Sequence, residues 1–440
     1  RLVRGRGREN TLRRHIVAYS PALDSAFSKS LSLAESLFTD IGERTHDGVG
    51  ITRATYGEGE QIAHDRVAAE ARTLGLEVTT DAAANLYVTL TGRDRALPSI
   101  VTGSHLDSVP RGGNYDGLAG VVAGLVCLAS LRRAEVTPPR DLTVMGIRGE
   151  ENCWFSAQHI GSRAAFGRLP PKILDTAVRA DTGHTLAWHM ADAGADVDAL
   201  RRGEAYLRSE RLAGFIELHI EQGPVLDEAG IAVGIVNAIR GNVRCPDVKC
   251  IGAYDHAGAL PRRLRRDAVM ASAELVAAME QLWKRIDDDG GDLVMTFGQL
   301  GTDPEAHSLT TIPGLVCFTF DARSHTQETL DRVTAEMHRL ANDIGRRRGV
   351  EFAFQPFSGA APAHMDPELR RQLGAGAQAL DMATLDLASG PGHDAADFAG
   401  AGVPAAMIFI RNRHGSHNPR EEMPMDAFTD GTRLLLWLLV

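Results

Sequence analysis

Hydrophobic and polar residues follow two different periods along the chain. Helical periodicity covers residues 21–76, apart from a polar loop at 47–59, and residues 118–133. Short apolar runs typical of strands lie at 76–80, 85–90, 99–104, 142–147, 215–220 and 405–410. Helices and strands that alternate in this way predict an α/β fold.

The middle of the chain shows a different order of elements. Its pattern predicts strand, helix, strand, strand, helix and strand, at 243–251, 265–286, 292–298, 314–322, 328–345 and 350–354. This order is the ferredoxin-like split βαβ pattern. We therefore expect a ferredoxin-like α+β domain at residues 237–355, inserted into a larger mixed-sheet α/β domain that is formed by residues 1–236 and 356–440.

Length and composition exclude several classes of protein. The 440 residues are 44% hydrophobic, which is ample for a packed core, and no stretch approaches the roughly 20 apolar residues of a membrane span. The net charge is −10, and no basic stripe interleaves with aromatic residues, so we expect neither nucleic acid nor membrane as a partner. The basic start, Arg1–Arg8, has no apolar core after it and is not a secretory signal; a targeting segment and a tail remain as alternatives.

The cysteines indicate the compartment. They are scattered and odd in number, and none forms a CxxC pair. We interpret all of them as reduced thiols of a cytoplasmic protein: Cys127, Cys153, Cys245, Cys250 and Cys317.

Two polar motifs follow the strand at 99–104. Residues 103–109 read Gly-Ser-His-Leu-Asp-Ser-Val, and in extended chain His105 and Asp107 face the same way. Asp107 could then accept the ring N–H of a metal-bound His105, although a plain polar turn is the alternative. Asp116, in Gly-Gly-Asn-Tyr-Asp-Gly at 112–117, precedes a helix. It can be an ordinary N-cap or a carboxylate that bridges two metal ions, and these two interpretations are compatible.

Three further motifs also follow predicted strands. Glu150 and Glu151 are adjacent carboxylates, of which one can bind a metal while the other acts as a general base; two solvated loop acids are the common alternative. His219 lies in His-Ile-Glu-Gln-Gly and His417 in Ser-His-Asn-Pro. Imidazole is an apt ligand for zinc, manganese, cobalt or nickel.

Taken together, these strand-end residues predict a metal centre. In open α/β sheets, ligands bind at the carboxyl ends of the strands. Five ligands with one shared carboxylate suit two divalent metal ions about 3.5–4 Å apart, a centre that polarises a scissile carbonyl and lowers the pKa of water. The five candidate ligands are His105, Asp116, Glu151, His219 and His417.

These motifs, together with Asp-His-Ala-Gly at 255–258 and Arg-Arg-Asp-Ala at 265–268, resemble the N-carbamoyl-L-amino-acid hydrolase and allantoate amidohydrolase family. That family is the hydantoinase/carbamoylase branch of the dinuclear metal aminoacylase and carboxypeptidase superfamily. The resemblance covers nearly the whole chain in the same order. It implies that Glu150 is the general base. It also implies that one metal is held by His105, Asp116 and His219, and that the other is held by Asp116, Glu151 and His417.

The resemblance also implies contacts with the substrate. His256 matches a histidine of the inserted domain that stabilises the developing oxyanion, often across a dimer, and Arg323 matches an arginine that grips the substrate carboxylate. Gln222 and His393, the latter in Gly-Pro-Gly-His-Asp, match residues of the substrate pocket. By their positions alone, His256 would be a surface-loop residue and Arg323 a partner in a sheet-edge ion pair. The histidines outside any motif are interpreted as surface or packing residues: His184, His189, His307 and His414.

The chain departs from the family pattern at three places. Thr310 replaces an asparagine that helps to bind the substrate carboxylate, Trp154 replaces a pocket-side arginine, and Ala-Leu replaces Thr-Thr at 259–260. A threonine offers one short polar group, and a tryptophan adds an apolar wall. These changes suggest a larger or more apolar leaving portion than in a typical allantoate enzyme.

The sequence therefore predicts a two-domain dinuclear metallohydrolase that cleaves a ureido or amide C–N bond in a small substrate bearing a carboxylate. The inserted domain would serve as a lid and as the interface of a homodimer. An amidase, aminoacylase or dipeptidase on the same scaffold is the nearest alternative. A non-catalytic metal-binding relative is the other, against which Glu150 argues because a pure binder needs no base.

Overall fold

The computed structural model describes residues 20–440, so the basic start of the chain lies outside the described residues. It divides the chain into two compact units. The first contains the residues up to Asn237 together with Met365–Leu387 and His393–Val440; the second contains Ala238–His364 and Ala388–Gly392. Among the described helices, none combines the length and the hydrophobicity that a membrane span requires.

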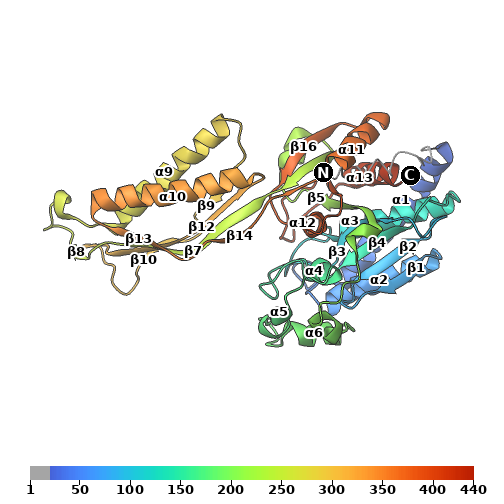
Figure 1. Cartoon of the computed structure of the whole chain (residues 1–440), viewed down its shortest axis with the longest axis horizontal. Coiled ribbons are helices and arrows are strands. Elements are labelled where there is room, and N and C mark those ends of the chain that lie inside the picture. The colour runs from blue at the N-terminus through green and yellow to red at the C-terminus, as the bar shows by residue number, and fades with distance from the viewer. Residues whose placement is uncertain (1–19) are drawn as a thin grey trace, which may run out of the picture. The chain divides into compact units, whose positions relative to one another are not determined.

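A mixed sheet forms the centre of the first unit (Figure 1). Its strands follow the order β1 (Glu77–Thr80), β2 (Leu86–Leu90), β4 (Leu142–Ile147), β3 (Ser99–His105), β5 (Leu212–Ile220), β17 (Ala405–Ile410), β6 (Val233–Ile239) and β15 (Ala363–His364), with β16 (Thr384–Ser389) paired to β6. Strands β4, β3, β5 and β17 are mutually parallel, whereas the outer pairs are antiparallel. The predicted mixed-sheet α/β fold is confirmed, and the carboxyl ends of the four parallel strands lie at one edge.

Helices cover both faces of this sheet. Helix α3 (Leu118–Arg133) is buried along nearly its whole length. It shares one core with α1 (Pro21–Arg44), α2 (Glu58–Thr73), α11 (Pro367–Ala379) and α13 (Met425–Leu439). Ile216 and Leu218 of β5 face this core, so Phe215 faces the other side, where it stacks on Phe398 of α12 (Asp394–Gly400) with ring centroids 3.7 Å apart.

Residues 154–201 form a helical segment with a small separate core, to which Tyr56 and Ala83 also contribute. It contains α4 (Ile160–Ala165), α5 (Pro171–Thr176), α6 (Leu186–Asp192) and α7 (Val197–Arg201). This segment lies between β4 and β5 in sequence, and its first residues follow directly on the two glutamates at the end of β4. A further short helix, α8 (Val225–Ala229), follows β5.

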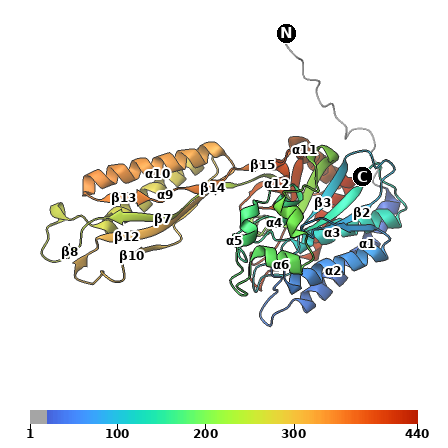
Figure 2. The same ribbon diagram turned by 60° about the horizontal axis from the view of Figure 1, so that its bottom comes forward.

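The second unit is an antiparallel sheet with two long helices on one face (Figures 1 and 2). The strand order is β10 (Leu300–Thr302), β12 (Leu315–Ser324), β7 (Gly241–Ile251) and β13 (Glu351–Phe354), with β9 (Val294–Thr296) on β12 and β14 (Ser358–Ala360) on β7. Alternate residues of β12, such as Phe318 and Phe320, are buried against α9 (Ala268–Asp288) and α10 (Gln327–Arg348). A small separate pair joins β8 (Asp255–His256) to β11 (Thr311–Ile312).

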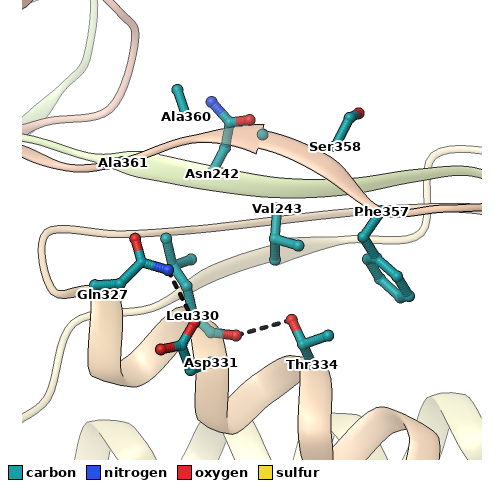
Figure 3. Close-up of a pocket in the computed structure, with 11 residues that line it drawn as sticks. Asn242, Val243, Gln327, Leu330, Asp331, Thr334, Phe357, Ser358, Ala360 and Ala361 are labelled. Atoms are coloured by element: carbon teal, nitrogen blue, oxygen red, sulfur yellow. Dashed lines mark hydrogen bonds between the residues drawn. The ribbon is translucent and has the colours of Figure 1, made fainter.

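The carboxyl-terminal boundary of the second unit differs from the predicted residue 355. Strand β14 continues to pair with β7, and β15 pairs with Ala238 and Ile239, the end of β6 that belongs to the second unit, so the chain leaves this unit only after His364. Residues 388–392 join it as well, because the backbone N–H of Arg240 donates to the carbonyl of Ser389 at 3.0 Å. Between β14 and α10 lies a hollow of about 240 Å³, whose polar groups on α10 hydrogen-bond within the helix (Figure 3).

A buried ion pair joins α2 to the end of β4. Arg148 Nη1 lies 2.7 Å from Glu60 Oε2, and neither side chain is more than 2% exposed. Glu60 also accepts the backbone N–H groups of Tyr56 and Gly149, at 2.8 and 3.1 Å. Burial raises the pKa of Glu60 to about 7, although Arg148 opposes this shift.

We expect Arg148→Met to lower the free energy of unfolding by about 3–5 kcal/mol, because it leaves the Glu60 carboxylate buried without its partner. The loss should grow as the pH rises above about 7, because the pKa of Glu60 is about 7 with Arg148 present and rises further when the arginine is removed. The variant then spends free energy on keeping Glu60 protonated, or on burying its charge, that the wild type does not. Adding Glu60→Gln should restore at least half of the loss. Denaturant unfolding of both variants measures these values, and a loss below about 1 kcal/mol in the single variant would contradict the prediction.

Candidate active site

Three side chains converge at the edge formed by the carboxyl ends of β3 and β5. Asp116 Oδ1 lies 3.4 Å from Nε2 of His105 and 3.2 Å from Nε2 of His219, and none of the three side chains is more than 4% exposed. Nδ1 of His105 faces the backbone oxygen of Asp107 at 3.0 Å, and Nδ1 of His219 faces that of Ile220 at 2.8 Å. Because a carbonyl oxygen only accepts, both Nδ1 atoms carry protons, and the Nε2 lone pairs point toward Asp116.

This arrangement has the chemistry of a cation site. The backbone N–H of Gly117 donates to Nε2 of His219 at 3.3 Å, as an unprotonated nitrogen requires, and the buried Oδ1 of Asp116 has no hydrogen-bond partner. Buried acceptors that face one another are costly unless a positive charge lies between them. Although burial disfavours a charged ring, Asp107 and Asp116 raise the pKa of His105 well above its usual value. The carboxylates around His105 therefore favour a positive charge at this position.

A second group of candidate ligands shares the same aspartate. Nε2 of His417 lies 3.4 Å from Asp116 Oδ2 and 3.4 Å from Glu151 Oε1, and the latter oxygen is buried without a hydrogen-bond partner. Burial raises the pKa of Glu151 to about 7. Asp116 thus directs one oxygen toward each group, and each group could hold one divalent metal ion.

Of the two interpretations of Asp116, that of an ordinary N-cap of helix α3 is wrong. The N-cap is Gly117, which makes no side-chain cap, and its φ of 69° turns the chain so that the Asp116 carboxylate faces the histidines. A Cβ atom at Gly117 would lie 2.5 Å from the ring of His105. This position therefore needs glycine both for its left-handed backbone and for the close approach of the ligand.

Two buried side chains that hold the Asp116 turn have no sequence motif. Glu421 Oε1 accepts the backbone N–H groups of Tyr115 and Asp116, at 2.8 and 3.3 Å. Arg53, which is fully buried, donates to the backbone oxygens of Leu106 and Asp116, at 2.8 and 3.3 Å. Because Arg53 and Glu421 are both distant in sequence from the Asp116 turn, no local sequence signal could have identified their role.

Asp107 organises the two glutamates at the end of β4. Its carboxylate accepts the backbone N–H groups of Glu150 and Glu151, at 3.1 and 3.2 Å, and the hydroxyl of Thr55 at 2.5 Å. The expected contact with His105 is made more closely by the backbone oxygen of Asp107 than by its carboxylate, at 3.0 against 3.4 Å. The loop that carries both glutamates is therefore tied to the strand that carries His105.

One histidine near the site was missed in the sequence. His159 Nε2 lies 3.2 Å from Oε1 of Glu150, and its Nδ1 is hydrogen-bonded to Asp397 of α12. No motif contains His159. Its partner Asp397 is 238 residues away in the sequence, so no local signal pointed to His159.

The predicted pocket residues of the first unit lie in different surroundings. Gln222 Nε2 donates to Asp116 Oδ2 at 2.8 Å. The His393 ring packs against that of His219 with centroids 4.5 Å apart. Trp154 is half-buried, and its indole N–H donates to the carbonyl of Ser108 at 2.8 Å. Gln222 therefore supports the ligand that both metal groups share.

A third group that could hold a metal consists of Glu217, His219 and His393. Both carboxylate oxygens of Glu217 are already used, since one accepts the hydroxyl of Ser104 at 2.7 Å and the other the backbone N–H of Ala395 at 2.9 Å. Burial lowers the pKa of His393 well below its usual value. The two groups that share Asp116 are therefore the better metal candidates.

Comparison with known proteins agrees with this geometry. The model of peptidase family M20/M25/M40 matches residues 101–439. This chain belongs to peptidase family M20/M25/M40. The family is metal-dependent, as the convergent histidines and carboxylates require. The resemblance seen in the motifs is confirmed.

Individual relatives of this M20 member are amidohydrolases. It is 35% identical over 387 residues to the N-carbamoyl-L-amino acid amidohydrolase of Geobacillus stearothermophilus, which covers 88% of this chain and 92% of the relative. It is 31% identical to the allantoate amidohydrolase of Bacillus subtilis, over 89% of this chain and 92% of the relative. The solved structure of a hydantoinase/carbamoylase family amidase from Burkholderia multivorans superposes with a TM-score of 0.83 at 27% identity, covering 93% of this chain and 96% of the other.

The other predicted site residues of this M20 member belong to its second unit. His256 is exposed on β8, and its Nδ1 accepts the backbone N–H groups of Gly258 and Ala259 at 3.1 Å, so Nε2 carries the proton. Thr310 is exposed beside it, with its carbonyl bonded to the N–H of Ala257 at 2.8 Å. Arg323 is half-buried and binds Asp321 at 2.9 Å and the carbonyl of Gly390 at 3.2 Å. Their roles toward a substrate stay predictions.

Proposed function

We propose that this chain is a metal-dependent amidohydrolase that cleaves a C–N bond of a ureido or amide substrate bearing a carboxylate, such as an N-carbamoyl-L-amino acid or an allantoate-like compound. The observation that supports this most strongly is Asp116, whose two oxygens face two separate ligand groups. The names of the relatives agree with this class of reaction.

Each residue at the sheet edge has a proposed part in the reaction. Two divalent ions (zinc, manganese, cobalt or nickel) would polarise the substrate carbonyl and lower the pKa of water, held by His105, Asp116, Glu151, His219 and His417. Glu150, which belongs to neither ligand group, would accept the proton of the attacking water and deliver it to the leaving nitrogen. Asp107 would keep both glutamates oriented through their backbone N–H groups.

The second unit would complete the site as a lid and as the interface of a cytoplasmic homodimer. Its tautomer makes the exposed His256 a donor at Nε2, which suits stabilisation of the oxyanion, in the same or the partner subunit. Arg323 and Thr310 would bind the substrate carboxylate, with Gln222 and His393 close to it. Closure of the lid would exclude water from the reacting groups.

An amidase, aminoacylase or dipeptidase that acts on a larger or aromatic amide is the second candidate. Trp154 favours it, because its indole is anchored to Ser108 and the Arg179 guanidinium lies 5.6 Å from the ring centroid. A fixed aromatic ring at this position would favour apolar over charged substrate groups.

We expect the metal-loaded enzyme to release ammonia from an N-carbamoyl-L-amino acid, and to prefer derivatives with long or aromatic side chains to allantoate. The panel should contain N-carbamoyl-L-amino acids, allantoate, ureidopropionate, N-acyl amino acids and aryl amides. Turnover of the acyl or aryl amides alone would support the second candidate. If allantoate exceeded every aryl-bearing or long-chain substrate, the proposed effect of Trp154 and Thr310 would be wrong.

A further inference from the structure

His159 lies between two carboxylates in the first unit. Its Nε2 is 3.2 Å from Oε1 of Glu150, and its Nδ1 is hydrogen-bonded to Oδ2 of Asp397. The side chains of His159, Glu150 and Asp397 are 6%, 13% and 20% exposed. An imidazole that contacts a carboxylate through each nitrogen holds both carboxylates at fixed positions.

The backbone holds the same geometry. The N–H groups of His159, Ile160 and Gly161 donate to the carbonyls of Glu150, Gly149 and Arg148 respectively, at 3.1, 2.8 and 2.8 Å. The segment that begins helix α4 is thus bonded, residue by residue, to the segment that ends in Glu150. The imidazole and the Glu150 carboxylate are therefore held together by the chain as well as by their own contact.

The backbone of His159 is itself unusual. Its φ of 55° lies in the left-handed region, and it forms the N-cap of α4 without a side-chain cap. A residue with a side chain in this conformation costs on the order of 1–3 kcal/mol, which glycine would avoid. The surrounding structure maintains this conformation, in which the imidazole contacts the two carboxylates.

The charges around His159 favour two protonated nitrogens. The charged groups that face it are Glu150 at the end of β4, Arg163 on its own helix, and Asp394 and Asp397 on α12. Ser162 donates to Asp394 at 2.6 Å. Although burial disfavours a charged ring, the hydrogen bonds with Asp397 and Glu150 raise the pKa of His159 well above its usual value.

We propose that His159, anchored by Asp397, is a positioning residue that fixes the carboxylate of Glu150 toward the reacting centre. The proposal rests on the proposed function, in which Glu150 is the general base. Contact at Oε1 leaves the other oxygen of Glu150 to receive and return a proton. Residues that orient metal ligands typically contribute 10–100-fold to affinity or activity, and we expect an effect of similar size for a residue that orients the general base.

The test uses His159→Phe, which keeps a buried ring but removes both nitrogens, and His159→Gln, which keeps a donor toward Glu150. We expect His159→Phe to lower kcat by about 10–100-fold with KM changed less than about threefold and with metal content unchanged. His159→Gln should recover at least about a tenth of wild-type kcat. The matched control is His189→Phe, since His189 is also a buried histidine of the helical segment but is bonded to Thr182, at 2.8 Å; its kcat should stay within about twofold of wild type.

The variant Asp397→Asn gives a second, independent test of the role of His159. It keeps the imidazole and removes the charge of its anchor, together with the pairing of that anchor with Arg163 at 3.2 Å, so kcat should fall by about tenfold. In the His159→Phe background it should have no further effect, because Asp397 acts through His159. If the variant His159→Phe does not fold, the kcat of Asp397→Asn alone serves as the kinetic test.

Crystal structures of the variants separate this inference from the proposed function. The Glu150 side chain should change rotamer in His159→Phe and keep its position in His159→Gln and His189→Phe. An active wild-type enzyme whose kcat is unaffected by His159→Phe and by Asp397→Asn would overturn the inference. A wild-type enzyme that hydrolyses nothing on the panel would contradict the proposed function, and the rotamer of Glu150 would then still decide whether His159 positions it.

Discussion

Glu150→Gln is expected to remove nearly all turnover while leaving the metal content intact. The substitution keeps the size of the side chain but removes its ability to accept a proton, and general-base catalysis typically contributes about 10²–10⁴-fold. Glu150 belongs to neither of the ligand groups that share Asp116, and its backbone remains bonded to Asp107. The measurement is kcat from ammonia release, together with elemental analysis of the bound metal.

The matched control for this variant is Glu204→Gln. Glu204 is an exposed glutamate of the first unit that pairs with Arg202 at 2.6 Å, so its substitution should leave kcat and metal content unchanged. Substantial residual activity in Glu150→Gln would refute the assignment of Glu150 as the general base. A loss of metal in the same variant would mean that Glu150 is itself a ligand.

Asp116→Asn should disrupt both metal positions, because Asp116 directs one oxygen toward His105 and His219 and the other toward His417. An amide is a much weaker metal ligand than a carboxylate, and it bridges two ions poorly. We expect fewer than two metal ions per chain and a loss of activity that exceeds the 10–100-fold typical of outer partners. Metal content and kcat are measured on the same preparation.

Thermal unfolding gives an independent reading of the same variant. A bound metal stabilises the folded state by mass action, so a chelator should lower the Tm of the wild type. In Asp116→Asn the chelator should have little effect. The control is Asp227→Asn, on α8, which loses partly exposed pairings with Arg411 and Arg413, at 3.9 and 3.2 Å. A variant at position 116 that keeps two metals and a normal chelator response would show that this carboxylate does not bridge.

The position of the site follows from the direction of four strands. Because β4, β3, β5 and β17 are parallel, residues that are far apart in sequence but close to the carboxyl ends of these strands meet at one edge. His105 and His219 lie within the last two residues of their strands, Glu151 follows β4, and His417 follows β17. The chemistry therefore depends on strand order as much as on the motifs.

The amino-acid sequence by itself determined the elements that depend on local pattern. The apolar runs of β4 and β17 are each buried in the structure, and each could be predicted from its own segment because a short apolar run is typical of a buried strand. The candidate ligands were also predicted, because each occurs in a short motif at the end of an apolar run. The parallel strands bring these candidate ligands together at one edge of the sheet.

Only the tertiary structure decided which distant groups hold those ligands. The Asp116 carboxylate could be a cap or a ligand until the turn at Gly117 was known, and the turn itself is held by Arg53 and Glu421 from elsewhere in the chain. The contacts of His159 with Glu150 and Asp397 likewise depend on packing between separate segments, over a sequence separation of 238 residues for the second. The periodicity of a sequence indicates whether a side chain is buried, but it does not identify the hydrogen-bond partner of a buried polar group. Such a group needs a partner because desolvation makes an unpartnered polar group costly. Any segment that lies nearby in space can supply that partner, so the partner depends on the tertiary structure.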